Sequence, residues 1–281
     1  MQTYDCKPTL NDTQVLEFCM NRFLMLDGIV PAEINQRAHD YLEAHPNGEP
    51  TDLLREDWFL RHIILQPEVA GAVRSLLGPN FGLPNLISNH RVRTPAPAQD
   101  WHRDGGSQHG PKLNHLQVFY YPQECRLGYG PTELLPGSHQ IFSKSLYLAH
   151  YGQIRGSYYA ATSAGSVFLT VYSIWHRRSA STATGLRNLL KYNYWRTTPP
   201  QRNWIEEPGF NPKTANYQIP IPLLREQREQ FKDCFDNAQM YFWLCGRAES
   251  FHLMGGQGWP VPADFVDGAY GFPGEPTSLR D

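Results

Sequence analysis

The pattern of apolar and polar positions divides the chain into a helical first third and a strand-rich middle. In the first third, apolar residues recur every three or four positions, as on the buried face of a helix. Residues that cap helices, a proline at a first helical position and a stop glycine mark the ends of these segments. The pattern predicts helices at residues 11–20, at 31–46 with the helix ending before Pro46, and at 67–78 with Gly78 as the stop, and a short apolar run at 23–28.

The middle of the chain follows another pattern. Short runs of β-branched and aromatic residues alternate with turns rich in Gly and Pro. No helical segments separate these runs, which argues against a doubly wound α/β sheet. Several strands at this spacing predict a sandwich or a barrel. The predicted strands lie within residues 85–93, 112–122, 130–137, 166–175 and 187–197.

The part of the chain beyond Thr197 is irregular. One helix is predicted at about 223–237, and the Gly- and Pro-rich segment from Gly255 onward predicts loops. The sequence contains no internal repeat and no linker-like tract. We therefore expect one domain over residues 1–281, with a β-rich core at about 85–197, a helical N-terminal part and a loop-rich C-terminal extension.

Composition narrows the class of protein. Hydrophobic residues make up 41% and charged residues 19%, as in globular domains, and the 13% of aromatic residues favours a β-sheet core. The net charge of -2 offers no basic stripe for a nucleic acid. The 5 cysteines are scattered, the N-terminal segment lacks a signal-peptide pattern, and no apolar run is long enough to span a membrane. We expect a cytoplasmic protein that binds neither nucleic acid nor membrane.

The segment QDWHRDGG (99–106) carries the first candidate for chemistry. In an extended strand, residues i and i+2 point to the same face, so His102 and Asp104 would project together. One imidazole and one carboxylate on the same face suit a divalent metal. The two glycines that follow allow a turn and leave room beside the metal.

His176 supplies a third candidate ligand, at the end of the apolar strand SVFLTVYSIW. Two His and one carboxylate form the facial triad of non-haem iron(II) oxygenases, which leaves three coordination positions open. A structural zinc site would instead use four ligands, usually including Cys. The ligand types therefore indicate a catalytic metal centre at His102, Asp104 and His176.

Arg187 lies eleven residues beyond His176. The polar segment between them is expected to form a loop that turns the chain back, so that RNLLKYNYW runs antiparallel beside the strand before His176. Arg187 would then lie within several ångströms of the metal. A guanidinium binds a carboxylate bidentately and stays charged when buried, which suits a dicarboxylate co-substrate.

Together, the HxD motif, GPTELLPGSH (130–139), WHRRS (175–179) and Arg187 resemble the phytanoyl-CoA dioxygenase family, over about residues 90–195. The resemblance implies a mainly β fold, a double-stranded β-helix (jelly roll, cupin-like) with flanking α-helices. It also implies Fe(II) as cofactor and 2-oxoglutarate and O2 as co-substrates, with succinate and CO2 released. By position, His102, Asp104 and His176 would be the iron ligands.

The resemblance further assigns Arg187 to the distal carboxylate of 2-oxoglutarate. Related halogenases replace the metal-binding carboxylate with a small residue, so the presence of Asp104 favours oxygenation over halogenation. One position departs from the family pattern: some members carry a Ser two residues after the distal His, where this chain has Arg178 followed by Ser179.

Two more residues are candidates for the co-substrate site. If Phe119 faces the pocket, strand alternation brings Gln117 with it, along with His115 and Tyr121. Gln117 could donate to 2-oxoglutarate or be a satisfied buried amide, and Thr132 could line the site or be an ordinary strand residue. A polar face formed by Asn89, Arg91 and Arg93 could contact an anionic substrate, although surface charge with one structural pair is the preferred interpretation.

These features predict a dioxygenase that oxidises an unactivated C–H bond by hydroxylation or oxidative ring closure. The substrate would be a small metabolite or natural-product intermediate, sugar-containing ones included, and the protein a monomer or homodimer. Two alternatives stay open: a cupin-type divalent-metal isomerase or hydrolase, and a non-catalytic jelly-roll ligand-binding protein. Arg187 separates the first alternative from a dioxygenase, and the intact triad argues against the second.

Overall fold

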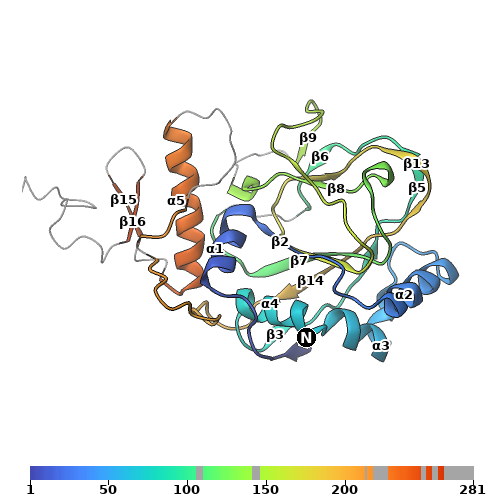
Figure 1. Cartoon of the computed structure of the whole chain (residues 1–281), viewed down its shortest axis with the longest axis horizontal. Coiled ribbons are helices and arrows are strands. Elements are labelled where there is room, and N and C mark those ends of the chain that lie inside the picture. Colours follow the sequence, from blue (N-terminus) through green and yellow to red (C-terminus); the bar gives the residue numbers. More distant parts are fainter. Residues whose placement is uncertain are drawn as a thin grey trace, which may run out of the picture.

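The computed structural model describes residues 1–105, 110–140, 146–212, 214–217, 227–247, 251–254 and 259–262, with only the backbone described at 140, 227–233, 251–254 and 259–262. Two antiparallel sheets form its centre, and helices cover one side (Figure 1). The larger sheet has the strand order β1-β3-β14-β7-β11-β2, with β4 also paired to β14. Its strands are β1 (Thr3–Tyr4), β2 (Phe23–Leu26), β3 (Phe81–Gly82), β4 (Ser88–Asn89), β7 (His115–Tyr121), β11 (Ser166–Val171) and β14 (Leu190–Trp195).

The smaller sheet has the order β10-β8-β12-β6-β9, and a separate pair joins β13 to β5. This mainly β architecture with flanking helices confirms the predicted fold class. The strands of the smaller sheet are β6 (Trp101–His102), β8 (Thr132–Leu134), β9 (Tyr147–Leu148), β10 (Tyr158–Tyr159) and β12 (His176–Arg178); the pair consists of β5 (Val92–Ala96) and β13 (Ser181–Arg187).

The helices are α1 (Asp12–Asn21), α2 (Ala32–Ala44), α3 (Asp57–Phe59), α4 (Pro67–Leu77) and α5 (Gln227–Leu244), with short 3-10 or π turns at Thr51–Arg55, Leu60–Ile64, Leu127–Tyr129 and Ser138–Gln140. The predicted caps form: the Asn11 side chain accepts from the Gln14 backbone, and α4 ends at Gly78 in a positive-φ conformation. The described helices include none that is long and apolar enough to cross a membrane.

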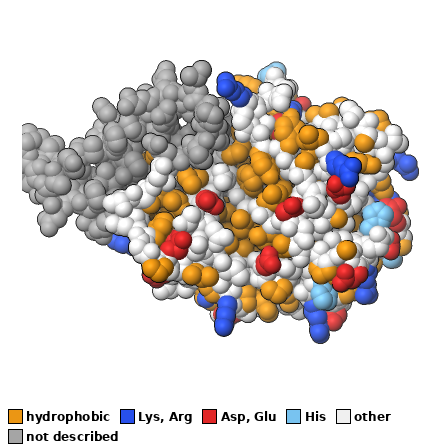
Figure 2. Space-filling view, viewed as in Figure 1, with side chains coloured by type: hydrophobic (Ala, Val, Ile, Leu, Met, Phe, Trp, Pro, Cys, Tyr) orange, Lys and Arg blue, Asp and Glu red, His pale blue; other side chains and the backbone are white. Residues whose placement is uncertain are grey.

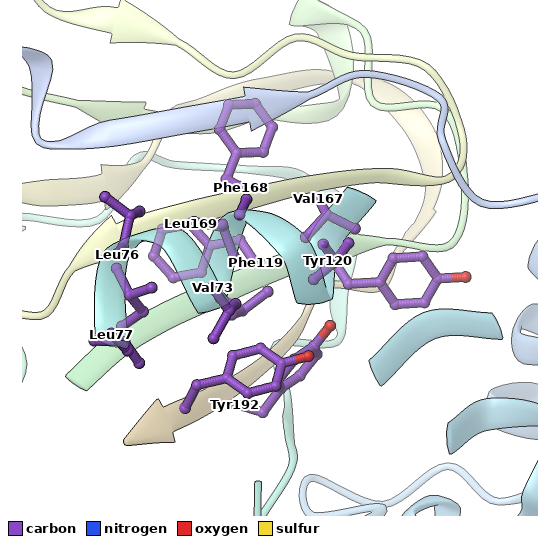
Figure 3. Packing of buried hydrophobic residues seen from close by; sticks show 14 of the residues in the cluster. Val73, Leu76, Leu77, Phe119, Tyr120, Val167, Phe168, Leu169 and Tyr192 are labelled. Carbon is purple, nitrogen blue, oxygen red and sulfur yellow. The ribbon is translucent and has the colours of Figure 1, made fainter. Parts of the chain in front are cut away.

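Strand β7 lies at the centre of the core because nearly all of its side chains are buried. Its alternation sends Tyr120 toward the helices, where the hydroxyl donates to Asn35 of α2. Figure 3 shows Val73, Leu76 and Leu77 of α4 packed near β7 and β11. The opposite face of β7 carries Gln117 and Phe119 toward the smaller sheet. The larger sheet therefore contributes side chains to the space between the two sheets, where the candidate site lies.

Four details differ from the sequence predictions. Segment 51–65 is helical, and α5 ends at Leu244, seven residues later than predicted. The segment between His176 and Arg187 forms strands rather than a loop, and β14 pairs with β7 instead of the strand before His176. Because β7 lies between β11 and β14 and is antiparallel to both, β14 runs in the same direction as β11. Most of the predicted C-terminal loops lie outside the described residues. The part of the tail that is described contains β16 (Trp259–Pro262), which pairs with β15 (Phe251–Met254).

Acidic and basic side chains are interspersed on the face of the molecule shown in Figure 2. Larger groups of hydrophobic side chains lie between them on the same face. The face therefore presents no continuous basic stripe.

Candidate metal centre

His102, Asp104 and His176 converge at one point in the smaller sheet. His102 and His176 are direct cross-strand partners on β6 and β12, and their ring centroids are 4.5 Å apart. Asp104 follows His102 by two residues, as the sequence predicted for a shared face. One ligand atom from each residue lies within 4.8 Å of the other two. The structure thus brings the three predicted ligands into one cluster.

The two imidazoles are oriented in the same way. Nδ1 of His102 is 2.8 Å from the Asp100 carbonyl, and Nδ1 of His176 is 3.0 Å from the Ile174 carbonyl. A carbonyl only accepts, so each Nδ1 carries the proton and each Nε2 keeps a lone pair for a metal. Burial, together with the nearby Lys191 charge, lowers the pKa of His176, which keeps that ring neutral. The donor set fits a divalent metal.

Asp104 is held by two donors from the larger sheet. Its Oδ2 accepts a hydrogen bond from Gln117 on β7 and from the Lys191 ammonium on β14, the latter at 2.7 Å. Burial alone would raise the pKa of Asp104, but His176, Lys191 and Gln117 lower it overall, so the carboxylate is ionised. Gln117, which was a candidate for binding the co-substrate, donates to the metal ligand Asp104 in this structure.

Lys191 is a site residue that the sequence analysis missed. Its side chain is 8% exposed, and its Nζ lies 3.5 Å from His176 Nε2 and 5.1 Å from the Phe119 ring centroid. The Lys191 ammonium is therefore a cation held directly beside the three predicted metal ligands. The sequence did contain a signal for Lys191, since it lies four positions after Arg187 within an apolar run. In a regular strand, two residues at this spacing face the same side.

Arg187 lies in the pocket that also contains the two imidazoles. It is 1% exposed, its Nη2 donates to Thr132 Oγ1 at 3.1 Å, and its guanidinium lies over the Tyr121 ring. Tyr121 in turn donates to Thr132 at 2.8 Å. The structure thus brings Arg187 and Thr132, both predicted from the sequence, to the same wall of the pocket.

The smaller sheet is supported behind the metal ligands by a buried ion pair. Arg177 Nε donates to Glu133 Oε2 at 2.6 Å, and Ser157 donates to the other carboxylate oxygen. The Arg177 guanidinium also lies 4.8 Å from the centroid of the Trp101 ring. Because side chains alternate along β12, this pair lies on the opposite face from His176. It ties β6, β8 and β12 together.

The remaining polar candidates lie elsewhere. Arg91 forms an ion pair with Glu43 and donates to the Leu42 carbonyl, while Asn89 bonds Asn188. Arg93 is exposed. The preferred interpretation of this face, surface charge with a structural pair, is confirmed. His139 lies in a 3-10 turn and lines a second cavity of about 220 Å³ with His115, Tyr172 and Met240.

The second cavity lies next to the metal cluster. The Tyr172 hydroxyl donates to the Gly105 carbonyl at 3.1 Å, directly after Asp104. His115 stands two residues before Gln117 on the same face of β7. The described lining residues of this cavity include Lys112, Asn114 and Ser173 but no carboxylate.

Comparisons with solved structures agree with the observed fold. HygX from Streptomyces hygroscopicus, with nickel and 2-oxoglutarate bound, is similar with a TM-score of 0.55 and 16% identity, over 70% of this chain and 90% of HygX. HygX with nickel, 2-oxoglutarate and hygromycin B bound gives 0.54 and 16%, over 69% and 90%. The epimerase SnoN, in complex with Fe3+, alpha ketoglutarate and nogalamycin RO, gives 0.54 and 12%, over 66% and 84%. The chain thus has the jelly-roll fold of these proteins.

A comparison with curated proteins gave no match. The sequence profile of phytanoyl-CoA dioxygenase (PhyH), by contrast, matches residues 30–188. The matched segment includes the His-Asp-His cluster and Arg187. Since it covers more than half of the chain, the protein belongs to the phytanoyl-CoA dioxygenase family, whose members depend on iron(II) and 2-oxoglutarate.

Proposed function

We propose that this protein is an Fe(II)- and 2-oxoglutarate-dependent dioxygenase that oxidises an unactivated C–H bond of a small metabolite or natural-product intermediate. The observation that carries the proposal is the pocket that the two imidazoles of the His-Asp-His cluster share with the buried Arg187 guanidinium. A metal-binding triad alone would suit many reactions. A buried arginine in the same pocket adds a site for a co-substrate with a free carboxylate.

His102, Asp104 and His176 would hold the metal on one face and leave the other positions open. When bound, iron(II) and 2-oxoglutarate supply an oxidant for C–H bonds from O2, with succinate and CO2 as the co-products. The protein contributes orientation. The backbone carbonyls of Asp100 and Ile174 fix the imidazoles, and Gln117 and Lys191 fix the carboxylate.

Arg187 would bind the distal carboxylate of 2-oxoglutarate. Its guanidinium is almost fully buried and has no acidic partner among the described residues. Thr132 and the Tyr121 ring fix its position. A charged hydrogen bond in such a water-poor place is stronger than one in solvent, which favours a co-substrate that ends in a carboxylate.

The primary substrate would bind in the cavity beside Asp104. Its described lining offers hydroxyl, amide and imidazole groups and the aromatic face of Tyr172, which suits a polar molecule of modest size. HygX with hygromycin B and SnoN with nogalamycin RO, relatives by fold, support a natural-product context. Hydroxylation and oxidative ring closure need the same centre and differ in how the substrate is placed.

The two alternatives differ from this proposal in the co-substrate. A cupin-type isomerase or hydrolase would bind a divalent metal but has no use for a buried cation such as Arg187. A non-catalytic binding protein would have no need for two imidazoles with their Nε2 atoms kept free for a metal. Binding of 2-oxoglutarate therefore separates the proposed dioxygenase from both alternatives, and metal binding separates the two alternatives from each other.

The test is anaerobic titration of the purified protein with Fe(II) and then 2-oxoglutarate, followed by visible absorption. We expect a weak charge-transfer band, loss of iron binding in His102→Ala and Asp104→Ala, and retained iron in Arg187→Ala. That last variant should bind 2-oxoglutarate more weakly by about 2–5 kcal/mol, the usual effect of truncating one partner of a buried charge pair. Arg93→Ala, an exposed arginine on β5, is the control. If the wild type gives no band and no 2-oxoglutarate affinity, the proposal is wrong.

A further inference from the structure

A second arginine lies in the pocket with Arg187. Strand alternation on β12 places Arg178 on the same face as His176, and Arg178 is the cross-strand partner of Thr132. The Thr132 hydroxyl accepts from Arg187 Nη2 at 3.1 Å. The two arginines therefore flank the same threonine, one from β12 and one from the end of β13, and both line the pocket.

The guanidiniums of Arg178 and Arg187 make few hydrogen bonds within the described part of the chain. The Nε atoms of Arg178 and Arg187 are buried and donate to no acceptor within the described part of the chain, and neither side chain has an ion pair there. Arg178 Nη1 makes one long contact, 3.4 Å, to the Ser179 carbonyl. Burial, and after it the charge of Arg187, lowers the pKa of Arg178. Two neighbouring cations in a partly buried pocket repel each other unless an anion binds between them.

The other arginine and the lysine that line the pocket are each paired with a carboxylate. Arg177, next to Arg178 in sequence but on the opposite face, is paired with the buried Glu133. Lys191, at the metal end of the pocket, is paired with Asp104. The described residues that line the pocket include no carboxylate. The positive charge of this pocket that no carboxylate among the described residues pairs with is therefore that of Arg178 and Arg187.

We propose that Arg178 is a second positioning arginine for the co-substrate, so that Arg178 and Arg187 together bind the distal carboxylate of the 2-oxo acid. This inference rests on the proposed function. Each carboxylate oxygen can accept two hydrogen bonds, so one carboxylate can be shared by two guanidiniums. The pocket thereby selects 2-oxo acids that end in a second carboxylate over those that end in a methyl group.

The test compares two 2-oxo acids that differ at the distal end. The protein is loaded with Mn(II), which supports no turnover, and the dissociation constants of 2-oxoglutarate and 2-oxovalerate are measured by calorimetry. Arg178→Met should weaken 2-oxoglutarate binding about ten- to a hundredfold, the usual effect of losing a hydrogen bond to a charged group. Binding of 2-oxovalerate, which lacks the second carboxylate, should not change. Arg178→Lys, which keeps the charge without the planar fork, should fall between the wild type and Arg178→Met.

The outcomes separate this inference from the proposed function. If the Mn(II)-loaded wild type does not bind 2-oxoglutarate, the proposed function fails. If the wild type binds it and Arg187→Met weakens it, while Arg178→Met does not, only the role of Arg178 is wrong. A purely structural role would weaken both acids equally, which would also overturn the inference. Should Arg178→Met fail to fold, Arg178→Gln gives the same comparison, because each variant carries its own reference in 2-oxovalerate.

Discussion

Replacing Glu133 by alanine should destabilise the protein strongly, although Glu133 does not touch the candidate metal ligands. The carboxylate is fully buried and accepts from Arg177 at 2.6 Å and from Ser157 at 2.6 Å. Without it, the Arg177 guanidinium stays buried against Trp101 with no counter-charge. Removing one partner of a buried ion pair commonly costs about 3–5 kcal/mol, because the other charge is left uncompensated.

The loss can be converted into a melting temperature. Unfolding entropy is about 2.1 cal/mol/K per residue, so for 281 residues it amounts to about 0.6 kcal/mol/K. A loss of about 3–5 kcal/mol then corresponds to a fall of about 5–8 °C. Glu133→Gln, which keeps the shape and one acceptor oxygen, should fall between the wild type and the alanine variant.

The measurement is thermal unfolding followed by circular dichroism, with a matched control. Glu124 and Arg126 form an ion pair of similar length, 2.8 Å, but their side chains are 52% and 74% exposed. Glu124→Ala should leave the melting temperature unchanged, because water screens exposed pairs. If Glu133→Ala lowers it no more than Glu124→Ala does, burial does not set the strength of the Glu133–Arg177 pair, and the reasoning is refuted.

Three further predictions concern charge and backbone geometry. Burial alone would raise the pKa of Asp12, but hydrogen bonds from Arg202, Glu207, Trp204 and Tyr241 lower it below its ordinary 3.8. The ionised carboxylate therefore stabilises the fold above about pH 4, and this contribution is lost as the pH falls below that value. In urea titrations, the decrease in unfolding free energy at acid pH should therefore be smaller for Asp12→Asn than for the wild type. Lys191→Met should lower the melting temperature of the metal-free protein but increase the further rise on adding Mn(II), because the metal replaces the lost cation beside Asp104; an equal rise in both proteins would contradict this. Gly165→Ala should destabilise by about 2–4 kcal/mol in urea unfolding, since φ is +85° and a Cβ would lie 2.6 Å from the Val30 carbonyl, whereas Gly152→Ala, with open space around it, should be neutral.

The fold could be predicted where the determinants are local. Capping residues and the stop glycine were enough to predict α1 and α4. Short β-branched and aromatic runs bounded by turns were enough to predict β7 and β11. Segment 51–65 was missed because its short 3-10, α and π turns have no regular period. The neighbour of β14 was also wrong, because strand pairing depends on contacts between residues far apart in sequence, which a local pattern does not encode.

The same distinction holds for the site. His102 and Asp104 are two residues apart, so local strand geometry was enough to predict that they point together. Lys191 reaches Asp104 only because β14 is paired with β7 in the register that sets Lys191 opposite Phe119. That register is a long-range property. Gln117 was predicted as a possible pocket residue, but its partner Asp104 follows β6 of the other sheet, and the packing of one sheet on the other is likewise a long-range property.

Strand β12 also limits how this protein can change over evolution. In three consecutive residues it presents His176, Arg177 and Arg178 to alternate sides of the sheet. A deletion or insertion of one residue here would exchange the two faces of the strand. Arg177 would then point into the pocket, and a residue that now lines the pocket would point toward Glu133. Substitutions at β12 can be selected one by one, but a change in its length would disrupt metal binding, co-substrate binding and folding together. We therefore expect homologous chains to vary in loop length around this strand and to keep its own length constant.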